Sequence, residues 1–314
     1  MKKILGSIVF IGGFVGILFI LSIFIKPKED MNGVVPNDRK VIDYKQDDVK
    51  EYDIFFFGDS ESYSSFIPAT FWKRYGITSY NFGTSGARVS DASYLIHEAF
   101  EKGSAKYVVV ETNMMTKFAG EFRDFDDKVN DIVYRLFPAI QYHNRWKSVL
   151  NPSFLFDKKR DESVDRGYVY RKGIVPYKGG EWMEPRKKKA KLGENVEDYI
   201  RELKAFVESK GATMILVTAP SPICSNKSKH DVLEQLAKDL SLQYIDLNYL
   251  TGTMGIDWEK DTRDGGNHLN FYGARKVSNY LGKYFSKKMK IENKKNKAEY
   301  SNWNDWLTKL KYKP

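Results

Sequence analysis

The stretch that decides the fold is DIFFFGDS, residues 53–60. The run is apolar through Phe57 and ends abruptly in a glycine, an acid and a serine. A short, continuous apolar run is typical of a strand in a parallel sheet that is covered on both faces. Gly58 permits a tight turn after the strand. Ser60 is then expected at the carboxyl end of the strand, where open α/β sheets bind their ligands, and it is the first candidate functional residue.

Four further segments have the same strand-like character. They are short and rich in apolar or β-branched residues: Ser79 to Phe82, Lys106 to Glu111, Thr213 to Thr218 and Gln243 to Leu247. Amphipathic helical patterns lie between and after them, within 196–207, 232–236 and 272–284. This alternation of strands and helices predicts an α/β fold, a flavodoxin-like doubly wound sheet of five parallel strands.

The segment from about 114 to 195 breaks the alternation. It is rich in aromatic and charged residues and has no strand–helix rhythm. We interpret it as an insertion at the carboxyl edge of the sheet, where loops of α/β enzymes carry substrate specificity. A purely structural subdomain would leave the same pattern. The α/β domain is expected at 51–286, with the insertion inside it, and a basic C-terminal tail at 287–314.

The N-terminal segment carries no charged side chain from Ile4 to Ile25. As a helix it is long enough to cross a hydrocarbon core of ~30 Å. A cleaved signal peptide usually has a shorter apolar run and a small-residue cleavage site, and no such site follows Ile25. We therefore favour an uncleaved transmembrane anchor at 1–28, followed by a linker at 29–50, and a cleaved signal is the alternative. Lysines flank both sides of the run, so the positive-inside rule leans only slightly toward an internal N-terminus. The expected location is the cell membrane, single-pass, with the α/β domain extracytoplasmic.

The net charge of +10 and the pI of about 9.2 favour anionic partners. Nucleic acid, anionic lipid headgroups and phosphate-rich wall polymers all satisfy that condition. An extracytoplasmic domain argues against nucleic acid. The basic tail also carries Trp303, Trp306, Leu307 and Leu310, which could share one face of a helix. That helix could rest on a membrane surface or dock on the domain, and the sequence is consistent with both.

Cys224 is the only cysteine, so no intramolecular disulfide and no cysteine-based metal site can form. The sequence contains no metal-ligand cluster, phosphate-binding glycine loop or dinucleotide fingerprint. Neither a cofactor nor a metal is expected.

His268 is the second candidate functional residue. It lies in the glycine-rich segment DGGNHLN, residues 264–270, and the chain has only 4 histidines. An acid just before a loop histidine suits a general base that a carboxylate orients, although a lone histidine is more often structural. Gly83, after the second strand, and Asn113, after the third, could donate hydrogen bonds to an oxyanion. A turn glycine and a solvated loop asparagine are the ordinary interpretations of these two.

Ser60, Gly83, Asn113 and His268 all project from one edge of the predicted sheet. In order and placement they resemble the SGNH/GDSL hydrolase family, whose four named residues are Ser, Gly, Asn and His. The resemblance covers about half of the chain and implies an SGNH hydrolase fold. It also implies a serine esterase or O-acyltransferase with Ser60 as nucleophile and His268 as base. The implied oxyanion hole consists of the backbone N–H groups of Ser60 and Gly83 and the side-chain amide of Asn113.

Two departures from the family pattern concern the third and last blocks. The third block usually reads G-x-N-D, whereas residues 111–114 read ETNM and keep only the asparagine. The last block usually reads D-x-x-H, but position 265 is a glycine. Asp264 lies one residue further back and Asp261 further still. We favour Asp264 as the acid that orients His268, through a one-residue bulge; a backbone carbonyl in place of either acid is the alternative.

Three short blocks are similar to one membrane-anchored subgroup of this family. They are FGDSES at 57–62, NFGTSG at 81–86 and HLN at 268–270. The subgroup comprises DltD-like and polysaccharide O-acyltransferase-associated proteins of Gram-positive bacteria, which work beside MBOAT-type membrane acyltransferases. It implies an acylated cell-surface glycopolymer, a polysaccharide or a teichoic acid, as the substrate. A hydrolase of lipid or small acyl esters and a non-catalytic partner of an acyltransferase complex are the alternatives.

Overall fold

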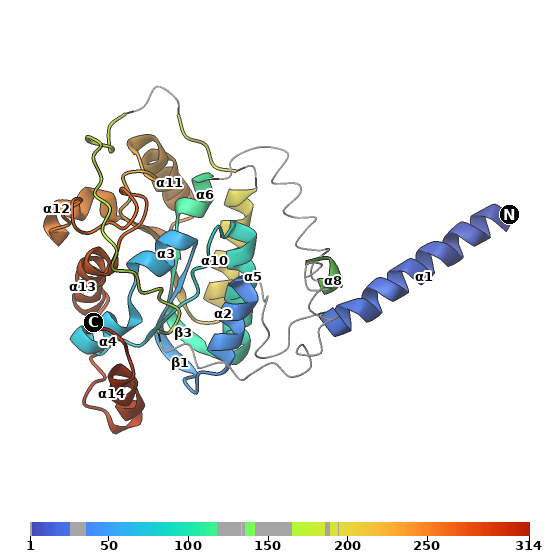
Figure 1. Cartoon of the computed structure of the whole chain (residues 1–314), viewed down its shortest axis with the longest axis horizontal. Helices are drawn as coiled ribbons and strands as arrows, with labels where there is room; N and C mark the ends of the chain where they lie inside the picture. Colours follow the sequence, from blue (N-terminus) through green and yellow to red (C-terminus); the bar gives the residue numbers. More distant parts are fainter. Residues whose placement is uncertain are drawn as a thin grey trace.

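The computed structural model describes residues 2–25, 36–117, 133, 136–141, 165–185, 189–193 and 195–314. Most of the predicted insertion and the first part of the predicted linker therefore lie outside the described residues. Figure 1 shows most of the described elements gathered around one sheet, with the long N-terminal helix α1 and the short helix α8 outside it.

The sheet has five parallel strands in the order β2-β1-β3-β4-β5. The strands are β1 (Glu51–Phe57), β2 (Ser79–Asn81), β3 (Ser104–Glu111), β4 (Thr213–Thr218) and β5 (Gln243–Asp246). This order confirms the predicted flavodoxin-like α/β fold, and the predicted bounds differ only at strand ends. The chain order reverses between β1 and β3, so the segments that follow these two strands meet at the switch point where such sheets bind ligands.

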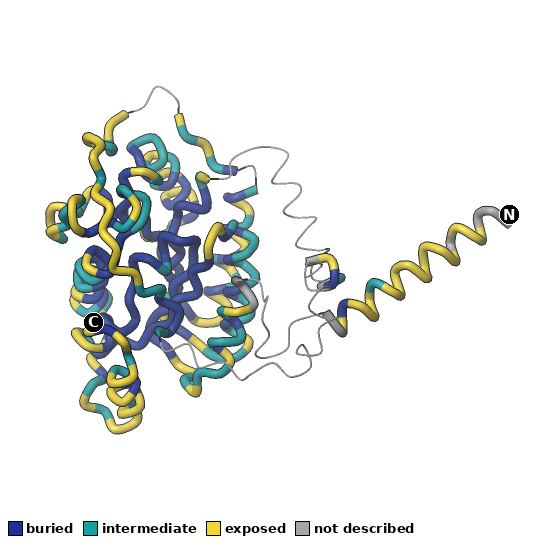
Figure 2. Tube along the Cα trace, in the orientation of Figure 1, coloured by how far each residue is buried: buried dark blue, intermediate teal, exposed yellow. Residues whose placement is uncertain are grey.

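β1 is apolar from Ile54 to Phe57 because both faces of the sheet are covered. Successive side chains of a strand point to opposite faces. Phe55 and Phe57 belong to one buried cluster, and Ile54 and Phe56 belong to another. The first cluster takes residues from α2 (Pro36–Lys45), α5 (Val89–Lys102), α10 (Val196–Ser209) and α11 (Lys227–Asp239), and the second mainly from α4 (Pro68–Tyr75) and α13 (Phe271–Lys288). Figure 2 shows the resulting buried centre between two helical layers.

The three predicted helical patterns correspond to α10, α11 and α13 and are confirmed. Shorter helices complete the described part: α3 (Ser60–Ser65), α6 (Asn113–Lys117), α8 (Pro138–Gln141), η3 (Leu247–Leu250), α12 (Thr251–Met254), η4 (Ala298–Tyr300) and α14 (Ser301–Thr308). Two of them, α3 and α6, begin at candidate site residues.

The predicted linker contains a helix that belongs to the domain. α2 buries Val41 and Tyr44, which are 5% and 0% exposed. The Tyr44 ring meets the rings of Tyr80 and Phe82 at centroid distances of 5.0 and 4.9 Å. These contacts join α2 to the end of β2.

The C-terminal segment also packs on the domain. Trp303 and Trp306 of α14 are 1% and 7% exposed, and the Trp303 ring lies 5.3 Å from that of Trp72. The Arg166 guanidinium lies 3.5 Å from the centroid of the Trp303 ring, a cation–π contact. Of the two interpretations of the tail, burial of the tryptophans supports the docked helix.

α1 (Lys2–Ile25) is apolar along its whole length. Its span Leu5–Ile23 has a mean hydropathy of 2.4, and only 6% of it is buried. By length and composition this helix could cross a membrane.

Candidate active site

Ser60 is placed by the tight connection between β1 and α3. Asp59 caps α3, because its carboxylate accepts a hydrogen bond from Glu61 N at 2.9 Å. Gly58 has φ +146°, and a Cβ at this position would lie 2.6 Å from the Cβ of Glu111. The connection therefore requires glycine at position 58. Ser60 is 7% exposed at the start of α3.

His268 lies within hydrogen-bond distance of Ser60. Its Nε2 is 2.7 Å from Ser60 Oγ, and its Nδ1 is 2.5 Å from Asp264 Oδ2. The backbone N–H of His268 donates to the other oxygen of Asp264 at 2.6 Å. Asp264 therefore fixes the imidazole so that Nδ1 carries a proton and Nε2 can accept one from the serine, as in a Ser–His–Asp triad.

Asp264, and not Asp261, is the acid that reaches His268. Asp261 instead accepts hydrogen bonds from Lys276 Nζ at 2.6 Å and from the backbone of Asp257 at 2.7 Å. The loop accommodates the extra residue because Gly265 and Gly266 adopt φ +72° and +92°. These left-handed conformations suit glycine and form the bulge that brings Asp264 to the imidazole.

The other two predicted site residues hold protein partners. Gly83 N–H donates to Asn81 Oδ1 at 2.9 Å, and Asn113 Nδ2 donates to Asp59 Oδ2 at 2.8 Å. A side-chain amide has two hydrogens, so Asn113 keeps a second one for an oxyanion. Asn113 thus lies beside the cap of the Ser60 helix, while the Gly83 N–H must leave Asn81 to serve an oxyanion. The oxyanion-hole assignment stays a prediction.

Three buried carboxyl groups lie behind Ser60, and the sequence reasoning did not single out this cluster. Asp59, Glu61 and Glu111 are 0%, 1% and 0% exposed. Burial raises the pKa of Glu61 and of Glu111 well above the ordinary carboxyl value, and the negative charge of Asp59 raises both further. Two sequence signals could have revealed this cluster: Glu61 directly follows Ser60, and Glu111 stands where the G-x-N-D pattern has its glycine.

A segment outside the sheet supports the histidine loop. Residues 165–185 begin with a turn at 165–167 and then form neither helix nor strand, and most of their side chains are exposed. Val175 N–H donates to Thr262 O at 3.1 Å, and Gly265 N–H donates to Val175 O at 2.9 Å. The His268 loop is thus held by backbone hydrogen bonds immediately next to Asp264. Because backbone contacts leave little trace in a sequence, this support could not be predicted.

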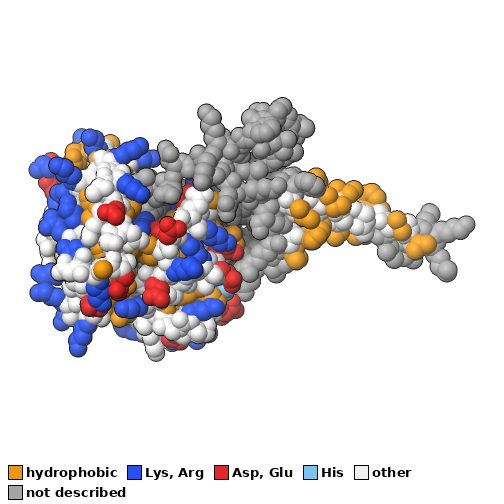
Figure 3. Space-filling model, turned by 90° about the horizontal axis from the view of Figure 1, so that it is seen from below, with side chains coloured by type: hydrophobic (Ala, Val, Ile, Leu, Met, Phe, Trp, Pro, Cys, Tyr) orange, Lys and Arg blue, Asp and Glu red, His pale blue; other side chains and the backbone are white. Residues whose placement is uncertain are grey.

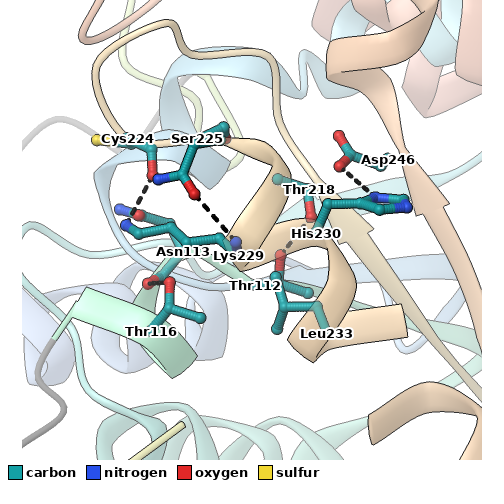
Figure 4. Close-up of a pocket in the computed structure, with 11 residues that line it drawn as sticks. Thr112, Asn113, Thr116, Thr218, Cys224, Ser225, Lys229, His230, Leu233 and Asp246 are labelled. Atoms are coloured by element: carbon teal, nitrogen blue, oxygen red, sulfur yellow. Dashed lines mark hydrogen bonds and ion pairs between the residues drawn. The ribbon is translucent and has the colours of Figure 1, made fainter. Parts of the chain in front are cut away.

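A small polar pocket adjoins the site (Figure 4). Its wall includes Asn113 and also Cys224, whose thiol donates to Asn267 Oδ1 at 3.1 Å. His230 Nδ1 lies 2.8 Å from Asp246 Oδ2 on the far wall, and this hydrogen bond raises the pKa of His230. The lining residues are Thr112, Asn113, Thr116, Thr218, Cys224, Ser225, Asn226, Lys229, His230, Leu233 and Asp246.

No group of three or more His, Cys, Asp or Glu side chains within the described residues is arranged to hold a metal ion.

The chain has distant structural relatives. No protein-family model and no curated protein matches it. It is similar to the psychrotrophic esterase EstA from a Pseudoalteromonas species, at 11% identity over 76% of this chain and 100% of that one, with a TM-score of 0.42. It is also similar to the lipase/acylhydrolase from Enterococcus faecalis, at 12% identity over 76% of this chain and 97% of that one, with a TM-score of 0.39. Likeness at this distance decides nothing about chemistry, so the function is inferred from the chain's own residues.

Proposed function

We propose that this protein is a serine esterase or O-acyltransferase of the SGNH type. One observation carries the proposal: Asp264, His268 and Ser60 form a continuous hydrogen-bonded chain at the carboxyl edge of the sheet. A nucleophile, a base and an acid that orients the base are the parts that acyl transfer through a covalent intermediate requires.

The proposed reaction has two halves that share one base. His268 Nε2 takes the proton of Ser60 as Oγ attacks an ester carbonyl, and it then gives that proton to the leaving alcohol. Backbone N–H of Ser60, the second amide hydrogen of Asn113, and Gly83 N–H after a local shift would hold the oxyanion, and one such donor is typically worth about 3–4 kcal/mol. Water or an alcohol then attacks the acyl-enzyme, again through His268.

We further propose an acylated cell-surface glycopolymer, a polysaccharide or a teichoic acid, as the substrate. Two features support this. The α1 helix is long and apolar enough for a single-pass anchor, and we propose that the domain lies outside the cell. Basic side chains also gather where α4 and α13 end, and blue side chains crowd one side of the face in Figure 3. The exposed cations of these two ends are Lys73, Arg74, Lys283, Lys287 and Lys288. A basic surface favours an anionic polymer, and an MBOAT-type membrane acyltransferase is the proposed partner.

The experiment must distinguish this proposal from two other functions. A hydrolase of lipid or small esters would use the same three residues with a different substrate. A non-catalytic partner of an acyltransferase complex would not need them, and the hydrogen-bonded Ser60 and His268 favour catalysis over that role.

The test is turnover of p-nitrophenyl acetate by the full chain in detergent, beside Ser60→Ala and His268→Ala variants. The proposal expects both variants to lose nearly all wild-type activity while they keep the wild-type thermal unfolding curve. Equal, background-level rates in all three proteins would remove the catalytic proposal and favour the non-catalytic partner. Acetyl or aminoacyl transfer to a teichoic acid or polysaccharide acceptor, compared with hydrolysis alone, then distinguishes the glycopolymer substrate from small esters.

A further inference from the structure

Glu61 follows the nucleophile in the sequence, and the mechanism above does not use it. It is 1% exposed, and neither of its carboxyl oxygens has a hydrogen-bond partner within the described structure. Its Oε1 lies 3.8 Å from His268 Nε2. The Cys224 thiol, a weak donor, also faces it. Buried polar atoms nearly always have partners, so an unpartnered carboxyl beside the base calls for an explanation.

Within the buried carboxyl cluster, Glu61 is the residue whose surroundings most favour the neutral carboxyl form. Glu111 accepts hydrogen bonds from Asn113 N at 3.0 Å and from Ala219 N at 3.3 Å. Asp59 accepts them from Glu61 N and from Asn113 Nδ2. Such N–H donors stabilise a negative charge, whereas the donor that faces Glu61 among the described residues is the Cys224 thiol, which is a weak donor.

The surroundings of Glu61 favour its protonated form. Burial raises the pKa of Glu61 well above the ordinary value, and the charges of Asp59, Glu111 and Asp264 raise it further. A protonated carboxyl has one O–H donor. The Glu61 side chain therefore brings a hydrogen-bond donor to within reach of the catalytic imidazole.

The demand for that donor changes during the reaction. In the free site, Ser60 Oγ lies 2.7 Å from His268 Nε2 and donates its hydrogen to that nitrogen. Acylation turns Ser60 Oγ into an ester oxygen, which has no hydrogen to donate. Nε2 then lacks a donor, while the Glu61 O–H lacks an acceptor. A movement of about 1 Å would close the 3.8 Å gap to an ordinary hydrogen bond.

Resting on the acyl-enzyme chemistry proposed above, we propose that Glu61 is a positioning residue that caps His268 Nε2 in the acyl-enzyme and so slows hydrolysis. Deacylation requires Nε2 to take a proton from the attacking water or alcohol and to return it to Ser60 Oγ. A capped Nε2 cannot take that proton. A bound alcohol that stays at the base displaces the cap more often than a passing water does, so the cap favours acyl transfer over hydrolysis.

Pre-steady-state turnover of p-nitrophenyl acetate by the full chain in detergent tests the cap. Glu61→Met keeps the length of the side chain and removes the donor, whereas Glu61→Gln keeps a donor. The wild type and Glu61→Gln are expected to give a rapid burst followed by slow turnover. Glu61→Met should keep the burst and deacylate at least threefold faster. An unchanged deacylation rate in Glu61→Met, or equal acceleration in both variants, would overturn the cap.

The pH profile of deacylation gives a readout that a merely structural role would not move. As the pH passes the raised pKa of Glu61, the cap loses its proton and wild-type deacylation should rise. Glu61→Gln should lack this rise. The other groups that face Glu61 are the same in both proteins: Asp59, Glu111, Cys224, Asp264 and His268. Identical profiles in the two proteins would overturn the cap, whereas absence of a wild-type burst would overturn the acyl-enzyme itself.

Discussion

Asp264 and Asp261 belong to the same loop and perform different tasks. Asp264 accepts hydrogen bonds from both Nδ1 and the backbone N–H of His268. An Asp264→Asn substitution keeps the size of the side chain but stabilises the wrong imidazole tautomer, so we expect kcat to fall roughly 10³-fold or more. KM should change little, because Asp264 acts through His268. Steady-state kinetics of the purified variant with p-nitrophenyl acetate would measure both.

Asp261→Asn is the matched control for that substitution. Asp261 is 2% exposed and pairs with Lys276 at 2.6 Å, so its loss weakens the loop rather than the base. We expect a lower melting temperature with kcat close to the wild type. A larger loss of kcat in Asp261→Asn than in Asp264→Asn would refute the assignment of the orienting acid.

At this scale, the proximity of the proposed nucleophile and base could be predicted from the sequence better than the contacts that surround them. Ser60 and His268 were predictable because a turn after a buried strand and a glycine-rich loop each leave a pattern. The partners of Gly83 and Asn113 were not predictable, since Asn81 and Asp59 reach them only through the fold. Glu61 was equally hidden, because its burial depends on neighbours from three other segments.

At the scale of elements, His230 links α11 to the end of β5. The hydrogen bond that His230 Nδ1–H donates to the Asp246 carboxylate raises the pKa of His230 above its unfolded value. The stability that this His230–Asp246 hydrogen bond contributes is therefore fully present below the unfolded pKa of His230, about 6.5, and is lost as the pH rises through its folded pKa. We expect His230→Gln to lower the melting temperature more at about pH 5.5 than at about pH 9. Thermal unfolding of both proteins at the two pH values would check this, and equal differences would contradict it.

Periodicity explains which elements could be predicted. The strands and α10, α11 and α13 carry regular apolar patterns, and their positions followed directly. α2 was taken as linker, because the burial of Val41 and Tyr44 depends on partners elsewhere in the sequence. The support of the His268 loop by residues 165–185 could not be predicted either, since it is made by backbone groups.

At the scale of the whole molecule, α1 and the α/β domain are separable by composition and burial. α1 is almost entirely exposed, and neither buried cluster of the described residues includes a residue from it. We therefore expect the chain without residues 2–28 to be soluble and to keep the kcat of the full chain. The full chain should remain with the membrane fraction through an alkaline wash, because an apolar helix of this length can span the bilayer. The intact mass of the protein recovered from cells distinguishes an anchor from a cleaved signal. A mass that includes α1 supports the anchor, whereas a mass that lacks it, with the protein released from cells, means that the domain acts free of the membrane.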